Sequence, residues 1–580
     1  MSFWPGEKLR YAETHFKFRL PWSLLYRPWP EIIFDMPFQA VPGTEPALWI
    51  VVRDADRFPT LIEKVEVEIK GGLPGAESLQ ARTIDLQIRA TEQIGFYPVK
   101  LGTLPAGKYE IRCKATARRI DSTTGNITDK VKIFDRWNLP GLKPAPLKLH
   151  VLAEMPPKAP GYAAGEMHCH TQYSRDHVEF GATPAVLQQA AASVGLDFAC
   201  CTDHAYDFAF TDEDYTKEAR SPAPRFQALR DEIAALPQGE GYPLLLAGEE
   251  VSAGNSKGEN VHITVFAPDT YLPGLGDCGR YWLENKPTRS IAQILQDTTA
   301  HCFAAHPFQQ MGIVEKFVFR RGYWTAKDLH CDKPHSIRGL QFWNGVRDEG
   351  FKLGREFWIQ ELGKGNYLLP IGGNDAHGDL NDTTAVSTPL FSLKHTRDHV
   401  FGRVRTVVCL PRHAEGERNE TSVSTRHQLD SLAPTGLRSD VEAQEMRSDV
   451  VASGLQGDKS TAITQEMLHE AFKGDNCYIT DGPALWWEHA DVHGVKSVVF
   501  HARNTKDFGE GFRYIRIFGR RYQSNGKLTK EEEVCKESLV ATPASADIAV
   551  YTDNFAYLRA ECESATGKFA LTSAAALERG

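Results

Sequence analysis

The chain has 580 residues, which is too many for one ordinary domain, so we expect two to four domains. Its composition, 42% hydrophobic and 24% charged, is that of a soluble globular protein with sizeable cores. The formal net charge of -9 argues against a general nucleic-acid binder, and no apolar run approaches the roughly 18 residues of a membrane span.

The N-terminal stretch MSFWPGEKLRYAETHFKFRL lacks the basic-then-apolar layout of a secretory signal, so we expect a cytoplasmic protein. The eleven cysteines agree with this expectation, because they are scattered and form no CxxC pair. As partners we expect a small-molecule substrate, with no nucleic acid and no membrane. The oligomeric state is left open.

Residues 1–155 are predicted to form a β-rich N-terminal domain. Its strand candidates show alternation or β-branched content between Gly/Pro turns: PALWIVVRD, KVEVEIKG, RTIDLQIRA and KYEIRCKATARRI. A β-sandwich-like packing is the simplest arrangement for them. Proline clusters near residues 139–161 predict a linker to the next domain.

In residues 162–410, short apolar runs alternate with helical patterns. The runs are GEMHCH, DFACCTDH, YPLLLAGEEV, NVHITVFAP, CFAAHP, RGLQFWN and YLLPIGGNDAH. The helix candidates are TPAVLQQAAASVGL, PRFQALRDEIAALP, SIAQILQDTTA and GFKLGREFWIQEL. Such alternation indicates β/α units and a mostly parallel sheet, and seven strands favour closure into a barrel. The predicted fold class is therefore α/β.

Residues 411–460 are polar and poor in aromatic side chains, which predicts a flexible insertion. Residues 461–580 begin with a helix candidate, TAITQEMLHEAFKG, and then become β-like again. We expect a helix followed by a second, sandwich-like β-rich module.

Six of the seven predicted strands in the middle domain end in side chains that bind metals. In chain order these are His168 and His170, Asp203 and His204, Glu249 and Glu250, His262, His306, and Asp375 and His377. The sixth strand alone ends without a strong ligand, at Trp343 and Asn344. Because the carboxyl ends of barrel strands meet on one face, these side chains should converge.

Side chains alternate faces along a strand, so His168 and His170 should point one way and Cys169 the other. Taken singly, His306 before a proline or His262 within a strand is as well explained by packing or capping. Taken together, imidazoles and carboxylates in this number exceed one coordination shell. We therefore predict two or three divalent ions, which could be zinc, manganese or iron.

Five motifs in this order, HCHTQYS, CTDHAY, GEEV followed by VHITVF, AAHP and GGNDAH, resemble those of the polymerase-and-histidinol-phosphatase (PHP) superfamily. The resemblance covers roughly residues 163–395. Together with the flanking β-rich regions, the later GDNCYITDGPAL is similar to the carbaryl-hydrolase-type metallohydrolases. The resemblance implies a distorted seven-stranded (β/α) barrel.

The resemblance also implies a trinuclear site. The ligands would be His168, His170, Glu250 and Asp375 for the first ion, Glu250, His262 and His306 for the second, and Asp176, His204 and His377 for the third. Two choices stay open: His177 beside Asp176, and Glu249 beside Glu250, where the family spacing favours Glu250. Asp203 would orient a neighbouring imidazole or hold a metal-bound water.

Such a site would make the chain a metal-dependent hydrolase, with Asp203, Glu250 and Asp375 as its catalytic carboxylates. A hydroxide bridging the metals would attack a phosphate ester, or a carbamate or carboxylic ester. A phosphate would need an arginine, for which Arg175 and Arg347 are candidates. An aryl carbamate would need aromatic walls, for which the candidates are Tyr173, Tyr206, Phe208, Phe210, Phe308 and Trp343.

Two other classes of function remain. A metal-binding structural or regulatory domain would keep the ligands without turnover. A non-haem iron oxygenase would need only two histidines and one carboxylate with open positions, which is fewer ligands than the sequence offers.

Overall fold

The computed structural model of the chain describes residues 29–73, 75, 78–135, 146–174, 181–210, 223–278, 285–330, 336–378, 380–381, 385–387, 392–394, 399–411, 462–492, 495–524, 527–538 and 544–577. Within these residues no helix is long and apolar enough to cross a membrane. Of the predicted insertion 411–460, all but Pro411 lies outside the described residues.

The N-terminal strands form two sheets around a shared core. They are β1 (Glu31–Asp35), β2 (Gln39–Ala40), β3 (Ala47–Arg53), β4 (Thr60–Gly72), β5 (Ser78–Ala90), β6 (Ile94–Lys100), β7 (Gly107–Ile120), β8 (Ile127–Phe134) and β9 (Leu147–Val151). One sheet has the order β1-β3-β6, and the other has the order β2-β9-β7-β4-β5 with β8 paired to β7. Ile50 of the first sheet and Ile111 of the second are both fully buried in this core, as alternation along the strands requires.

The middle of the chain supplies the strands that carry the predicted ligands. They are β10 (Tyr162–His170), β11 (Phe198–His204), β12 (Leu244–Gly254), β13 (Asn260–Phe266), β14 (His301–Ala305), β15 (Gly339–Asn344), β16 (Leu369–Gly373), β17 (Ala376–His377), β18 (Ala385–Ser387), β19 (Ser392–Lys394) and β20 (Arg405–Cys409). The strands from β10 to β16 are sheet neighbours in chain order. β17, just after β16, pairs with β10, so the sheet curls and the ends of its strands approach one another.

Eight helices are described. They are α1 (Pro184–Val194), α2 (Ala205–Ala209), α3 (Ala223–Ala234), α4 (Ile291–Gln296), α5 (Ile313–Phe317), α6 (Ala326–Leu329), α7 (Glu349–Leu362) and α8 (Gln465–Lys473). Local capping fixes several of their starts. The Thr183 side chain accepts from the Val186 amide at α1, and the Asp348 side chain accepts from the Phe351 amide at α7.

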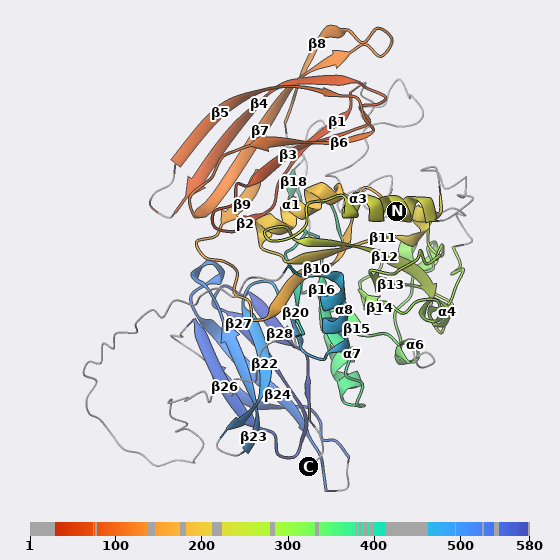
Figure 1. Cartoon of the computed structure of the whole chain (residues 1–580), viewed down its shortest axis with the longest axis vertical. Coiled ribbons are helices and arrows are strands. Elements are labelled where there is room, and N and C mark those ends of the chain that lie inside the picture. The colour runs from red at the N-terminus through yellow and green to blue at the C-terminus, as the bar shows by residue number, and fades with distance from the viewer. Residues whose placement is uncertain are drawn as a thin grey trace, which may run out of the picture.

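The C-terminal strands continue the same sheet and add a smaller one. They are β21 (Cys477–Thr480), β22 (Ala484–Val492), β23 (Val495–Arg503), β24 (Phe512–Arg521), β25 (Glu532–Ser538), β26 (Ser545–Tyr551), β27 (Phe555–Ser564), β28 (Phe569–Thr572) and β29 (Ala575–Ala576), with a 3-10 turn at Lys506–Phe508. β20 pairs with both β10 and β21, so the large sheet has 15 strands. Figure 1 shows the N-terminal sheets at one end of the molecule and the C-terminal strands at the other.

The expected α/β class, a seven-stranded (β/α) barrel between β-rich modules, is wrong. Strands far outnumber helices among the described residues, and the ligand-bearing strands belong to one large mixed sheet. β12, β13 and β14 are antiparallel neighbours, and only residues 255–259 join β12 to β13. A parallel crossover needs about a dozen residues or more, so this part of the sheet is not built from β/α units. Apolar runs in a sequence do not reveal strand direction.

Cys169 provides a test of the strand faces. Its side chain is fully buried in an apolar cluster with Leu187 and Val194 of α1, on the opposite face from His168 and His170. We expect Cys169→Ala to lower the free energy of unfolding by about 1 kcal/mol through lost packing, with bound metal unchanged. Chemical denaturation and metal analysis of the same preparation check this. A loss of metal at unchanged stability would contradict the assignment of faces.

Candidate metal centre

Eight of the nine predicted ligands lie among the described residues, and the fold brings all eight together. Their donor atoms form three groups, each within 4.8 Å: His168, His170, Glu250 and Asp375; Glu250, His262 and His306; and His170, His204 and His377. All but His306 and Asp375, which are partly buried, are buried side chains. These groups could hold metal ions. Asp176 and its alternative His177 lie outside the described residues.

The first group joins three elements of the sheet. His168 and His170 end β10, and their Nε2 atoms lie 3.2 Å apart. Asp375, between β16 and β17, places its Oδ1 3.2 Å from His170 Nε2, and Glu250 of β12 places its Oε1 3.4 Å from His168 Nε2. Four donor atoms therefore face one small space.

The second group surrounds the same carboxylate from the other side. Glu250 Oε1 lies 2.6 Å from His262 Nδ1 and 2.9 Å from His306 Nε2. His262 comes from β13 and His306 follows β14 directly. Glu250 is thus common to two groups.

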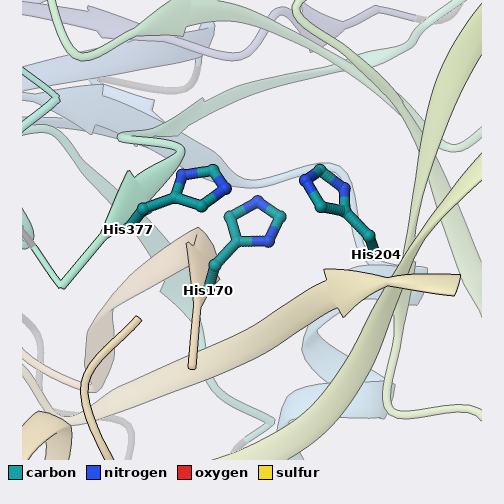
Figure 2. Close-up of side chains that lie close together, drawn as sticks. All are labelled: His170, His204 and His377. Atoms are coloured by element: carbon teal, nitrogen blue, oxygen red, sulfur yellow. The ribbon is translucent and has the colours of Figure 1, made fainter. Parts of the chain in front are cut away.

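The third group consists of imidazoles alone, with His170 between His204 and His377 (Figure 2). The ring centroids of His170 and His377 are 3.9 Å apart, and the planes of these two rings are nearly parallel. The ring centroids of His170 and His204 are 4.4 Å apart. His204 Nδ1 also lies 2.9 Å from Glu250 Oε2. This contact links the third group to the other two.

A relay of hydrogen bonds fixes the tautomer of His168. The Asp375 carboxylate only accepts, so the Asn344 amide nitrogen donates to Oδ2 at 3.3 Å and its oxygen faces Gln341. The Gln341 amide nitrogen donates to that oxygen at 3.1 Å, which turns Gln341 Oε1 to His168 Nδ1 at 2.7 Å. His168 must therefore carry a proton on Nδ1, so in the neutral ring the lone pair lies on Nε2 and faces the cluster.

A second set of contacts fixes His170. Ser174 gives its one hydroxyl proton to Asp203 Oδ1 at 2.7 Å, so its oxygen accepts from His170 Nδ1 at 2.9 Å. Asp203 also accepts from the Thr171 amide and hydroxyl, each at 2.8 Å. Asp203 therefore positions His170 through Ser174, and His170 Nε2 also presents a lone pair to the cluster.

These assignments test whether a cation fits the centre. The Nε2 atoms of His168 and His170 lie 3.2 Å apart, so with both rings neutral two lone pairs would face each other, and either a proton or a metal ion must lie between them. His204 Nδ1 and Glu250 Oε2 are buried and close but do not make a hydrogen bond. Nitrogen and carboxylate donors of this kind are ligands for zinc, manganese and iron, so the residues fit a metal centre.

The pKa shifts of the buried imidazoles and of Glu250 show that positive charge is stabilised in the cluster. Burial lowers the pKa of the His168 imidazole, but the Glu250 and Asp375 carboxylates raise it to about 9. Burial likewise lowers the pKa of His262, whereas Glu250 and Asp277 raise it to about 10. Burial raises the pKa of Glu250, yet His262 and His168 lower it well below its usual range. Protons and metal ions would therefore compete for these atoms.

The backbone around the centre is constrained. His306 and Asp375 have positive φ angles of 27° and 52°, a region that non-glycine residues rarely occupy. Gly373 allows close approach, because a Cβ there would lie 2.9 Å from the His168 Cβ. The buried Glu166 carboxylate accepts from the amides of His168 and Asn374, which ties β10 to the segment that carries Asp375.

Sequence reasoning missed the side chains that hold the ligands. Gln341 and Asn344 lie on β15, the strand that ends without a ligand, and Asp277 lies in the connection after β13. Their one available signal is their place near a strand end, which polar residues in loops share. Glu249 is buried outside the three groups, and both its oxygens accept from the Leu272 amide, so Glu250 is the carboxylate of the pair that faces the centre.

The predicted rim residues divide between packing and a pocket. Arg347 pairs with Glu563 and stacks on Phe569, so it ties the centre to the C-terminal strands, and Arg175 lies outside the described residues. Of the six aromatic candidates, Phe308 lines a pocket beside His306, and Tyr206 stacks on the His204 ring. The others pack or bond elsewhere, namely Tyr173 to Glu232, and Phe208, Phe210 and Trp343 in buried positions.

An arginine that the sequence did not single out lies beside the centre. A second pocket is lined by His262, His306 and Arg321, together with Asn260, Gln309, Tyr323 and Trp324. Arg321 Nε donates to Asp277 Oδ2 at 2.6 Å. The centre therefore adjoins an open space that contains a guanidinium group.

No family model matches the chain, and no curated protein matches it. Among solved structures, a cycloisomaltooligosaccharide glucanotransferase of Paenibacillus sp., complexed with cycloisomaltoheptaose, is 10% identical. The match covers 94% of this chain and 71% of that chain, with a TM-score of 0.16. At this TM-score the match shows neither a shared fold nor a shared activity.

Removing a ligand should remove metal. We expect His168→Ala and Asp375→Ala each to lower the bound metal by at least one ion per chain and to abolish any activity that depends on it, because each side chain faces Glu250 and His170. Elemental analysis of purified, unchelated protein measures this. His330→Ala is the control, because His330 pairs with Glu361 outside the cluster. Equal metal in all three variants would contradict the assignment.

The relay to His168 can be tested separately. We expect Gln341→Leu to weaken metal binding roughly 10–100-fold, because His168 loses the acceptor that fixes its tautomer. Gln188→Leu is a matched control, since Gln188 is also buried and its amide nitrogen donates to two carbonyls away from the centre. Competition with a chromophoric chelator gives both affinities. Equal affinities in the two variants would show that Gln341 does not position His168.

Proposed function

We propose that the chain is a metal-dependent hydrolase that uses two or three divalent ions, zinc, manganese or iron, and acts on a phosphate ester. The observation that carries the proposal is the convergence of the three groups on Glu250 beside a pocket that contains Arg321. The likeness of the motifs to those of the PHP superfamily supports the same chemistry. The proposal depends on this set of side chains and not on the fold class.

An open pocket argues against a purely structural metal site. Structural zinc sites are closed by four protein ligands, whereas catalytic sites keep a position for water or substrate. His262 and His306 belong to the second group and also line the pocket, so a substrate can approach this side of the cluster. This placement favours catalysis over the non-catalytic alternative. The number of donors exceeds that of a mononuclear iron oxygenase site.

The chain's own residues divide the work of hydrolysis. When bound, clustered divalent ions supply hydroxide near neutral pH and neutralise charge on the ester oxygens. Glu250 and Asp375 hold the cluster, and Asp203 orients His170 through Ser174 without reaching the donor atoms. No side-chain nucleophile is then required.

Arg321 favours a phosphate over a neutral ester. Its Nε is held by Asp277, so the guanidinium has a fixed orientation beside His262 and His306. Guanidinium groups bind phosphate through two parallel hydrogen bonds. Phe308 in the neighbouring pocket offers an apolar wall, which favours an aryl carbamate or carboxylic ester as a second candidate.

A variant of Arg321 can distinguish phosphate esters from carbamates and carboxylic esters as substrates. We expect Arg321→Gln to lower kcat/KM for an aryl phosphate by roughly 10–100-fold through loss of a charge-assisted contact, and to leave the metal content unchanged. Hydrolysis of an aryl carbamate should change little. Assays of manganese- and zinc-loaded protein on matched aryl phosphate, carboxylic ester and carbamate substrates measure this.

Arg320→Gln is the neighbouring control, because Arg320 is exposed and does not line the pocket. If the loaded wild-type protein hydrolyses none of the three substrates, the hydrolase proposal fails. If it hydrolyses the carbamate or carboxylic ester alone, the phosphate assignment fails and the second candidate takes its place.

A further inference from the structure

Asp277 connects a metal ligand to the arginine of the pocket. It lies in the connection between β13 and α4, and its side chain is fully buried. Its Oδ2 accepts from His262 Nε2 at 3.0 Å and from Arg321 Nε at 2.6 Å, while its Oδ1 accepts from the Ser252 hydroxyl. One carboxylate thus contacts both a predicted metal ligand, His262, and the arginine of the pocket, Arg321.

Asp277 fixes the position of one proton on His262. Arg321 Nε can only donate, and the carboxylate only accepts, so His262 must donate through Nε2. His262 Nδ1, 2.6 Å from Glu250 Oε1, is then the nitrogen whose proton a cation can replace. Asp277 therefore selects the tautomer of His262 that can bind a cation together with Glu250 and His306.

The same carboxylate sets the direction of the guanidinium. With its Nε held by Asp277, Arg321 lines the same pocket as His262 and His306, and its guanidinium has two terminal nitrogens besides Nε. These terminal nitrogens make no hydrogen bond to the residues that the structure describes. They are therefore available to an anionic oxygen of a substrate.

The β-sheet register makes the arrangement rigid. Ser252 is directly opposite His262 in the antiparallel pair of β12 and β13, and it lies two residues after Glu250 on the same strand. The serine, the histidine and the glutamate consequently share one face of the sheet. Asp277 covers this face, because its carboxylate accepts hydrogen bonds from Ser252 on β12 and from His262 on β13.

We infer that Asp277 is a positioning residue that couples metal binding at Glu250, His262 and His306 to anion binding at Arg321. This inference rests on the proposed function. Because Asp277 orients both partners, weakening it should affect the metal and the anion together. Removing Arg321 alone should affect only the anion.

The test is Asp277→Asn, which keeps the size of the side chain but removes the negative charge of the acceptor that His262 Nε2 and Arg321 Nε share. We expect cobalt or zinc to bind roughly 10–100-fold more weakly, with a changed visible absorption spectrum of the cobalt form. We also expect the dissociation constant of inorganic phosphate to rise at saturating metal. Asp328→Asn is the matched control, because Asp328 is equally buried, accepts from Thr325 and Ser256, and contacts none of the ligands.

The coupling is tested with Arg321→Gln and the double variant. We expect Arg321→Gln to weaken phosphate binding and to leave the cobalt spectrum unchanged. The double variant should lose less phosphate affinity than the product of the two single losses, because both act through one contact. Multiplicative losses, or an unchanged metal affinity in Asp277→Asn, would overturn the inference.

The outcomes separate the inference from the proposed function. If the wild-type protein itself binds fewer than two ions, the proposed function fails first. If Asp277→Asn does not fold, the tautomer can be read in the wild-type protein by long-range proton–nitrogen NMR of labelled histidine, with His262→Gln for assignment. With metal bound, a proton on His262 Nε2 supports the inference, and an Nε2 without a proton overturns it.

Discussion

One buried carboxylate, Glu250, sets the constraint on which the rest of the centre depends. An isolated ionised carboxylate is very costly to bury, so it must be met by positive charge or by donors. Its oxygens face imidazole nitrogens from four different parts of the sheet, namely His168, His204, His262 and His306. Two of these nitrogens, in His168 and His262, are made acceptors by partners on the other side of the ring. A metal ion is a species that could satisfy such a set of atoms.

The surrounding structure keeps these atoms in place. Behind the ligands lie hydrogen-bond acceptors that orient each ring: Gln341 for His168, Ser174 and Asp203 for His170, and Asp277 for His262. The strained backbone at His306 and Asp375 lies directly beside packed strands, because His306 follows β14 and Asp375 precedes β17. The C-terminal strands contribute to this rigidity, since β21 pairs with β20, the neighbour of β10, and Arg347 reaches Glu563.

The grouping of the predicted ligand side chains was within reach of sequence reasoning, whereas the fold class was not. The i, i+2 spacing of His168 and His170 places both on one face, and alternation alone predicts that Cys169 is buried on the other. Strand direction depends on non-local pairing, so the antiparallel run of β12, β13 and β14 left no mark in the apolar pattern. Asp277 and Arg321 are 44 residues apart in the sequence and meet only through folding. Arg347 had a suitable position in the chain, but it bonds to the C-terminal strands.

The central claim is that these three groups bind divalent ions. The most direct measurement is anomalous X-ray scattering at the absorption edges of zinc, manganese and iron, from crystals of protein purified without chelator. We expect at least two anomalous peaks per chain, each within bonding distance of Glu250 or of the His170, His204 and His377 group. No peak at these residues, or a single peak elsewhere, would contradict it.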